Sequence, residues 1–246
     1  MEPIYRKSFE ISALHLDSNG RTKPSVLLFF AQEAACRHCD LLKLDWDTMA
    51  KQDLFWAIIR HRVVITRLPA EGETITVETW PMPTTRSAFP RATIGYDSNG
   101  KELFRTVALW VLMNTKTRTM VLPGKSGVVL EGIVRGIEPE LPSSILPKSW
   151  EHTLSRQVRY TELDRNGHVN NTRYLDWVCD LLPNDFHREH PIREFTVCYL
   201  NEALEGQQID LSWELENSAQ LHVDGRRVRT DVRGEYDRVF SAQMLF

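Results

Sequence analysis

The sequence predicts an α+β protein made of two similar halves, each a curved antiparallel sheet wrapped around a central helix. Three observations predict this fold class. The motif Leu-Asp-x-Asn-Gly occurs at residues 16–20 and again at residues 163–167. Each copy follows a strand-like segment and precedes a helical one. A proline-rich segment separates the two copies, so we interpret the chain as a duplicated unit.

The first half supplies the clearer helix. Residues 7–13 are expected to form a strand and residues 24–36 a helix. That helix is apolar on nearly every side from residue 26 to residue 31, which is typical of a helix buried against a sheet. A Glu-Gly pair then opens residues 71–80, where apolar and polar side chains alternate as in a half-buried strand. Further strands are expected at 92–96 and 102–113, with a turn at 97–100.

The second half repeats this order. Residues 155–161 are expected to form a strand, residues 169–182 a helix, and residues 205–213, after a second Glu-Gly pair, another strand. A further strand at residues 220–223 is expected to turn at Asp224 and Gly225.

A linker is expected between the halves. Residues 136–147 hold three of the chain's twelve prolines, and proline resists both helix and central strand. The predicted organisation is an N-terminal domain at residues 1–135, a linker at 136–150 and a C-terminal domain at 151–246.

Composition excludes several classes of protein. Hydrophobic residues make up 42% and charged residues 26%, which is a globular balance. The formal charge of -3 argues against a nucleic-acid partner, because phosphate binding needs surplus Lys and Arg. The sequence has no run of about 18 apolar residues, so a membrane-spanning helix is not expected. The charged N-terminus resembles neither a signal peptide nor a transit segment, and four cysteines suit a reducing compartment, so we expect a cytoplasmic protein.

No metal or cofactor is predicted. Cys36 and Cys39 have redox-motif spacing but lie in a predicted helix, and no second pair completes a zinc site. We therefore expect buried core thiols. His187 and His190 stand between two prolines, which favours a polar loop over a metal site.

The two copies differ in titratable residues. After the shared glycine, the first copy has Arg21 and the second has His168. Three residues before the shared Glu-Gly pair, the first copy has Leu68 and the second has Glu202. A duplicated chain in which one copy alone carries these groups is expected to have one active site, in its second half.

The motif places three polar residues close together. Asp164, Asn166 and His168 alternate, which would put them on one side of an extended loop. A helix is expected directly after His168, and its N-terminal N–H groups attract developing negative charge. The alternative interpretation is a plain turn, since the first copy has the same Asp and Asn.

The residues from Asp164 to Tyr174, followed by Leu175 and Trp177, resemble the catalytic motif of acyl-acyl-carrier-protein thioesterases. The first half is similar to that family at residues 55–65, 71–80 and 109–118. The resemblance implies two tandem hot-dog domains, an acyl pocket shaped by the first, and the catalytic set Asp164, Asn166, His168 and Glu202 in the second. Plant members commonly have cysteine directly after the glutamate, where this chain has Ala203.

The resemblance implies hydrolysis of long-chain acyl-acyl-carrier-protein, with the carrier protein as partner and a bacterial-type enzyme as the expected form. Glu202 would activate a water, Asn166 and helix N–H groups would hold the carbonyl, His168 would orient the water or protonate the leaving thiolate, and Asp164 would anchor the loop. Attack by Asp164 itself is an open alternative.

Other functions stay open from the sequence. An acyl-CoA thioesterase of the same fold is the nearest alternative, and a non-hydrolytic acyl-binding protein is a second. Arg226, Arg227, Arg229 and Arg233 form a basic cluster that suits an acidic carrier, although a solvated strand face is the favoured interpretation. Both a monomer and a homodimer stay open, because the duplication already supplies the domain pairing that single hot-dog domains need.

Overall fold

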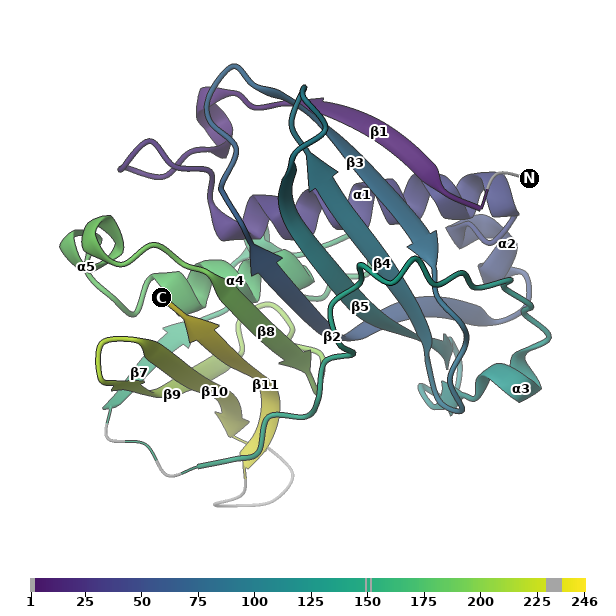
Figure 1. Cartoon of the computed structure of the whole chain (residues 1–246). Helices are drawn as coiled ribbons and strands as arrows, with labels where there is room; N and C mark the ends of the chain where they lie inside the picture. The colour runs from purple at the N-terminus through teal and green to yellow at the C-terminus, as the bar shows by residue number, and fades with distance from the viewer. Residues whose placement is uncertain (1–2, 149, 151, 229–235) are drawn as a thin grey trace. The chain divides into compact units, whose positions relative to one another are not determined.

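The computed structural model describes residues 3–148, 150, 152–228 and 236–246. The chain divides into two compact units, Met1–Pro142 and Ser143–Phe246 (Figure 1). Each unit is an antiparallel sheet with a helix against one face, as the α+β prediction requires. The predicted domain limits, residues 1–135 and 151–246 with a linker at 136–150, stay predictions.

The first unit has the strand order β1–β3–β4–β5–β2. Helix α1 (Pro24–Leu42) packs against β1, β3 and β4 (Figure 1). The strands are β1 (Tyr5–Glu10), β2 (Leu54–Ile65), β3 (Thr74–Pro81), β4 (Phe89–Tyr96) and β5 (Glu102–Asn114), and β6 (Met120–Val121) pairs with β5. The short elements are η1 (Ala13–His15), α2 (Trp46–Ala50) and α3 (Pro123–Ser126).

Helix α1 forms where the sequence places it and is longer than expected. Pro24 stands in its first turn, where a missing backbone N–H costs nothing, and Lys43 ends it in the left-handed conformation at φ 60°. Its buried positions include Leu27, Phe30 and Ala34, and the Phe30 ring lies 4.4 Å from that of Phe9 in β1. The apolar residues of α1 therefore pack on the sheet, as the sequence pattern predicted.

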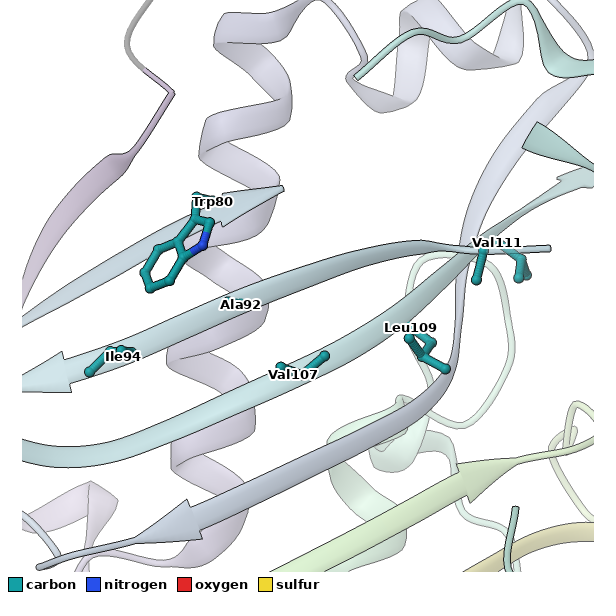
Figure 2. Packing of buried hydrophobic residues seen from close by; sticks show 7 residues of the cluster. Trp80, Ala92, Ile94, Val107, Leu109 and Val111 are labelled. Atoms are coloured by element: carbon teal, nitrogen blue, oxygen red, sulfur yellow. The ribbon is translucent and has the colours of Figure 1, made fainter. Parts of the chain in front are cut away.

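An apolar cluster fills the sheet face that lies away from α1. It holds Trp80, Ala92, Ile94 and Val107 (Figure 2). Ile133 and Ile137 from the connecting segment pack on this cluster. Backbone bonds fix that segment, because Ile133 donates to the Pro81 carbonyl at 3.0 Å and Arg105 donates to the Ile137 carbonyl at 3.0 Å. The connecting segment is therefore part of the first unit's core.

The second unit has the equivalent strand order, β7–β9–β10–β11–β8. Its main helix, α4 (Asn171–Cys179), is about half the length of α1 and begins two residues later than predicted. The strands are β7 (His152–Gln157), β8 (Glu194–Tyr199), β9 (Gln208–Glu216), β10 (Gln220–Val228) and β11 (Tyr236–Leu245). The short helices are η2 (Tyr160–Glu162) and α5 (Asn184–Glu189).

The units share their strand register. Gly95 of β4 faces Phe104 of β5, and Gly225 of β10 faces Phe240 of β11. In each pair the phenylalanine ring occupies the space of the missing side chain. A Cβ would lie 2.2 Å from the Phe104 ring at residue 95, and 2.1 Å from the Phe240 ring at residue 225. Each pair adjoins a break in register, so both glycines mark the same bulge.

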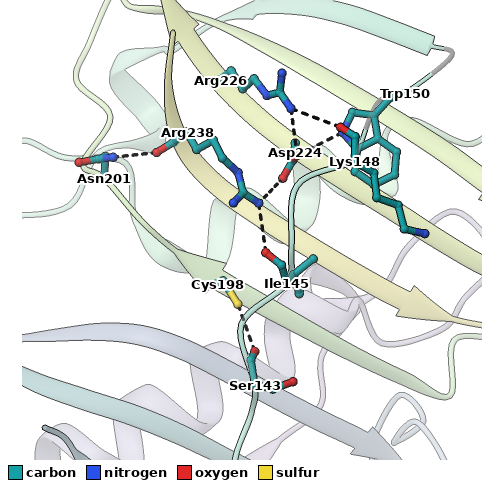
Figure 3. Close-up of polar contacts among 9 residues, drawn as sticks. All are labelled: Ser143, Ile145, Lys148, Trp150, Cys198, Asn201, Asp224, Arg226 and Arg238. Atoms are coloured by element: carbon teal, nitrogen blue, oxygen red, sulfur yellow. Dashed lines mark hydrogen bonds and ion pairs between the residues drawn. The ribbon is translucent and has the colours of Figure 1, made fainter.

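The predicted turn at Asp224 and Gly225 is wrong, because β10 continues to Val228. Asp224 is fully buried and accepts hydrogen bonds from Arg238 at 2.7 Å, Arg226 at 3.2 Å and the Trp150 indole at 3.1 Å (Figure 3). Gly225 is the bulge glycine. An Asp-Gly pair at a turn and one at a bulge have the same composition, so the sequence could not separate them.

Two smaller expectations are also corrected. His187 lies within α5, not in a loop, because Pro183 supplies its N-cap and leaves the helix intact. Cys36 is exposed rather than buried, whereas Cys198 is buried. In the described residues no group of three His, Cys, Asp or Glu side chains could hold a metal ion.

The sheet face toward α1 in the first unit carries a buried polar band. It consists of Thr79, Arg91, Thr93, Thr106 and His61 from the strands and His38 from α1, all less than a tenth exposed. Arg91 donates to His38 Nδ1 at 3.0 Å and to Thr79 Oγ1 at 3.4 Å. His61 Nε2 lies 2.5 Å from Thr106 Oγ1. No carboxylate pairs with Arg91 among the described residues, so a guanidinium is buried there without an anionic partner.

Candidate active site

The repeated motif of the second unit forms a tight loop. The Asp164 backbone N–H donates to the His168 carbonyl at 2.7 Å, and the Gly167 N–H donates to the Asp164 carbonyl at 3.0 Å. Gly167 has φ 76°, a conformation that glycine adopts without strain. The backbone therefore reverses here instead of running extended, so the predicted alternation of side chains on one side is not what gathers these residues.

The Asp164 carboxylate holds this loop together. Its Oδ1 accepts from the Asn166 N–H at 2.7 Å and from the His168 N–H at 3.4 Å. Its Oδ2 accepts from the Asn166 side-chain amide at 3.3 Å. Several N–H groups of one loop that bond a single carboxylate fix its position. These contacts suit the anchoring role that the sequence suggested for Asp164.

His168 and Glu202 meet although 34 residues separate them in the sequence. His168 Nε2 lies 3.4 Å from Glu202 Oε2. The imidazole is mostly buried, with 20% of its side chain exposed, while the Glu202 side chain is 44% exposed. A carboxylate that reaches both solvent and an imidazole can bind a water and pass its proton on. The structure thus pairs His168 with Glu202 and, in the same loop, Asp164 with Asn166.

Backbone pairing explains why Glu202 reaches the loop. His168 and Leu204 form an isolated antiparallel bridge, and the Val169 N–H donates to the Ala203 carbonyl at 2.9 Å. Ala203, directly after Glu202, is fully buried. The thiol of Cys198 in this unit is buried and donates to the Ser143 carbonyl at 3.6 Å. A cysteine nucleophile at this site is therefore unsupported.

The start of α4 offers fewer donors than the sequence predicted. Asn170 is the N-cap, and its side-chain oxygen accepts from the Thr172 N–H at 3.0 Å and the Thr172 hydroxyl at 2.8 Å. The cap satisfies an N–H that a substrate carbonyl was expected to use. The Tyr174 ring packs one turn further on, 5.7 Å from that of Tyr199, and burial raises the pKa of Tyr174 above its ordinary range.

The first unit repeats the loop without the reactive pair. Asp17 Oδ1 accepts from the N–H groups of Asn19 at 2.8 Å and Arg21 at 3.0 Å. Leu16 and Thr22 form the bridge that Leu163 and Val169 form in the second unit. The Asp-x-Asn-Gly motif thus forms the same loop in both units, and the second unit adds the contact between His168 and Glu202.

Arg227 is a site residue that sequence reasoning missed. Its Nη1 donates to the Glu202 carbonyl at 2.6 Å, and neighbouring Arg226 bonds the buried Asp224. Both arginines are partly exposed on β10 and bonded within their unit, so the solvated strand face stays a prediction. Arg229 and Arg233 lie outside the described residues. The signal was present in the sequence as a basic cluster, but nothing in it linked one member to Glu202.

Two family profiles match this chain almost end to end. The acyl-ACP thioesterase N-terminal domain matches residues 2–122, and the acyl-ACP thioesterase C-terminal domain matches residues 147–238. The chain belongs to the acyl-ACP thioesterase family. The two profiles fall on the two units, as the resemblance in the sequence implied.

Several curated relatives of this chain are chloroplast proteins of plants. The dodecanoyl-[acyl-carrier-protein] hydrolase of Cinnamomum camphora is 28% identical over 214 residues, which is 81% of this chain and 56% of the relative. The oleoyl-acyl carrier protein thioesterase 1 of Arabidopsis thaliana is 26% identical over 228 residues, 84% of this chain and 62% of the relative. The chain thus spans little more than half the length of these relatives.

Solved structures confirm the fold. An acyl-ACP thioesterase from Bacteroides thetaiotaomicron superposes with TM-score 0.87 at 24% identity, covering 99% of this chain and 98% of that one. The 12:0-ACP thioesterase of Umbellularia californica gives TM-score 0.83 at 23% identity, covering 100% and 97%. The prediction of two tandem hot-dog domains is confirmed. Among the described residues, the helices are too short or too polar to cross a membrane.

Proposed function

We propose that this chain hydrolyses acyl-acyl-carrier-protein thioesters to free fatty acid, with Asp164, Asn166, His168 and Glu202 as its catalytic residues. The observation that carries the proposal is the 3.4 Å contact between His168 Nε2 and Glu202 Oε2. This contact lies in the unit that matches the family's C-terminal domain, at positions where the first unit has Arg21 and Leu68.

The reaction needs a base, a site for the oxyanion and a proton for the thiolate. Glu202 takes a proton from water, and the water oxygen forms a bond to the thioester carbonyl carbon. The carbonyl becomes an oxyanion, which the Asn166 amide stabilises once it turns from Asp164 toward the substrate. The C–S bond then breaks and the thiolate takes the proton through His168, so the products are a carboxylic acid and a thiol.

The central test is thiol release. Purified protein with acyl-acyl-carrier-protein of graded chain length should release the carrier thiol, and His168→Ala and Glu202→Gln should abolish most of that release. Arg21→Ala, at the matching position of the first unit, is the control for loop disturbance and should keep activity. Equal rates for all four proteins would exclude this site, and no release with any substrate would favour an acyl-binding protein.

The nucleophile is a separate question. Because the Asp164 carboxylate already accepts N–H groups from its own loop, we favour water as the nucleophile. A single turnover in ¹⁸O water should place the label in the fatty acid and leave Asp164 unlabelled. Label in the Asp164 carboxylate would instead indicate an anhydride intermediate.

The carrier partner can be tested with the same acyl group. We expect higher kcat/KM with the acyl group on the carrier protein than on CoA, because a carrier protein contacts the enzyme surface beyond the thioester arm. Equal values would support the acyl-CoA thioesterase alternative.

The setting of the reaction is also part of the proposal. We place it in the cytoplasm, because the four cysteines are free thiols. Cell fractionation tests that location, and sedimentation of the pure protein distinguishes a monomer from a homodimer.

A further inference from the structure

We propose that Arg227 is a positioning residue that holds Glu202 in its working place. This inference rests on the proposed function, in which Glu202 is the general base. Arg227 Nη1 donates to the main-chain carbonyl of Glu202 at 2.6 Å, and the Arg227 side chain is only 24% exposed. Because the bond is made to the backbone of Glu202, Arg227 leaves the carboxylate available for water and for His168.

Arg227 is itself held by its neighbour in the sheet. Arg227 in β10 and Asp237 in β11 are direct cross-strand partners, and Arg227 Nη2 lies 3.2 Å from Asp237 Oδ2. The ion pair fixes the plane of the guanidinium, so Nη1 is aimed at Glu202 before substrate binds. A charge-assisted bond from a fixed donor loses less side-chain entropy than one from a mobile side chain.

The segment that carries Glu202 is bonded at each of its residues. Asn201 donates its side-chain amide to the Arg238 carbonyl at 2.8 Å, and the Ala203 carbonyl accepts from the Val169 N–H at 2.9 Å. Leu204 donates its N–H to Gln207 Oε1 at 3.0 Å. Arg227 supplies a bond to the backbone of Glu202, whose side chain contacts His168. Loss of that bond removes a main-chain anchor of the residue that acts as general base.

This arrangement is specific to the second unit. The register places Asp210 opposite Arg226 and Thr76 opposite Tyr96, so the position of Arg227 corresponds to Asp97 in the first unit. Asp97 caps a turn there, accepting from the N–H groups of Asn99 and Lys101 at 2.9 Å each. Arg227 therefore joins His168 and Glu202 as a group that only the second unit has at this place.

The first experiment separates positioning from binding and from charge. Arg227→Gln should lower kcat by about 10- to 100-fold with little change in KM, because a misplacement of roughly 1 Å costs about that much. Arg227→Lys keeps a charged donor and should recover part of the loss. Arg226→Gln removes the same charge one residue away and is the matched control, with kcat expected to stay near that of the wild type.

The second experiment tests the link to Asp237. Asp237→Asn should lower kcat in the same direction, and the double variant with Arg227→Gln should lose little more than Arg227→Gln alone, because both changes release the same bond. Amide hydrogen exchange reads the positioning directly, without turnover. Residues 201–204 should exchange faster in Arg227→Gln and unchanged in Arg226→Gln.

The outcomes separate the two proposals. A wild-type kcat in Arg227→Gln, or equal losses in Arg227→Gln and Arg226→Gln, would overturn the positioning role while leaving thioester hydrolysis in place. Unchanged exchange at residues 201–204 would overturn it even for a protein without turnover. A wild-type protein no faster than His168→Ala would overturn the proposed function instead.

Discussion

The two units use one framework for opposite distributions of polarity. In the first, the sheet face toward α1 has the cross-strand row Thr79, Thr93 and Thr106, and the equivalent row of the second unit is Trp213, Val223 and Ala242. Arg91 corresponds to Leu221, and His61 corresponds to Phe195. At the motif loop the second unit is the more polar one, because it has the His168 imidazole and the Glu202 carboxylate where the first unit has Arg21 and Leu68.

This difference corrects a simple view of the duplication. The first half did not become uniformly apolar when it lacked His168 and Glu202. It buries a polar band on the sheet face toward α1, whereas the equivalent row of the second unit is apolar and the ionisable pair lies at the partly exposed loop. An ionisable pair at a loop reaches water and substrate, whereas a buried guanidinium does neither without moving. The polarity of equivalent positions thus differs although the two units share their strand register.

The largest effect is expected at the loop. Glu202→Gln and His168→Ala should each lower kcat by about 10² to 10⁴-fold, the usual contribution of a general base or acid. The double variant should lose less than the product of the single losses, because the two groups act on one water. Steady-state kinetics of the three variants measure this. Losses that multiply would show that the two residues act independently, and the contact would then be incidental.

The pH dependence of stability tests the buried band. Burial lowers the pKa of His61 to about 3 from its ordinary value near 6.5. Between these two values the unfolded chain binds a proton that the folded chain does not, so stability should fall as pH drops from about 6.5 towards 3, by up to about 1.4 kcal/mol per pH unit. Urea titrations of wild type and His61→Phe, the residue of the second unit, should differ in this slope. Equal slopes would show that His61 becomes protonated in the folded protein.

The shared bulges should respond alike. Gly95→Ala and Gly225→Ala each place a methyl group inside a buried phenylalanine ring, so each should destabilise by about 1–3 kcal/mol. Gly124→Ala is the control, because nothing lies within 4 Å of a Cβ there. Denaturant midpoints report the three variants. A large loss in one unit alone would mean that the two bulges are not equivalent.

The smallest effect is expected from Arg91→Leu, which copies Leu221 into the first unit. A buried guanidinium without a carboxylate partner among the described residues contributes little net stability, so the free energy of unfolding should change by no more than about 1 kcal/mol. Chemical denaturation measures it. A loss of several kcal/mol would show that the bonds to His38 and Thr79 outweigh the cost of burying the charge.

The sequence predicted more of the framework than of the site. The repeat at Asp17 and Asp164 located both loops, because a glycine with positive φ and a self-capping aspartate are local properties. Comparison of the two halves at matching positions singled out His168 and Glu202, because the first half has Arg21 and Leu68 there. It could not locate Arg227, whose bond to Glu202 spans 25 residues and depends on strand register. Asp224 was misjudged for the same reason, since two of its three partners, Trp150 and Arg238, come from other segments of the chain.

The segment that covers Trp80 and Ile94 bears on how the halves can be separated. A fragment ending at residue 126 would lose Ile133 and Ile137 and expose a hydrophobic sheet face to water, which favours aggregation. A fragment ending at residue 142 would retain that cover. Any attempt to express the N-terminal half alone, or to recombine it with the C-terminal half of a relative, should therefore place its junction after Pro142.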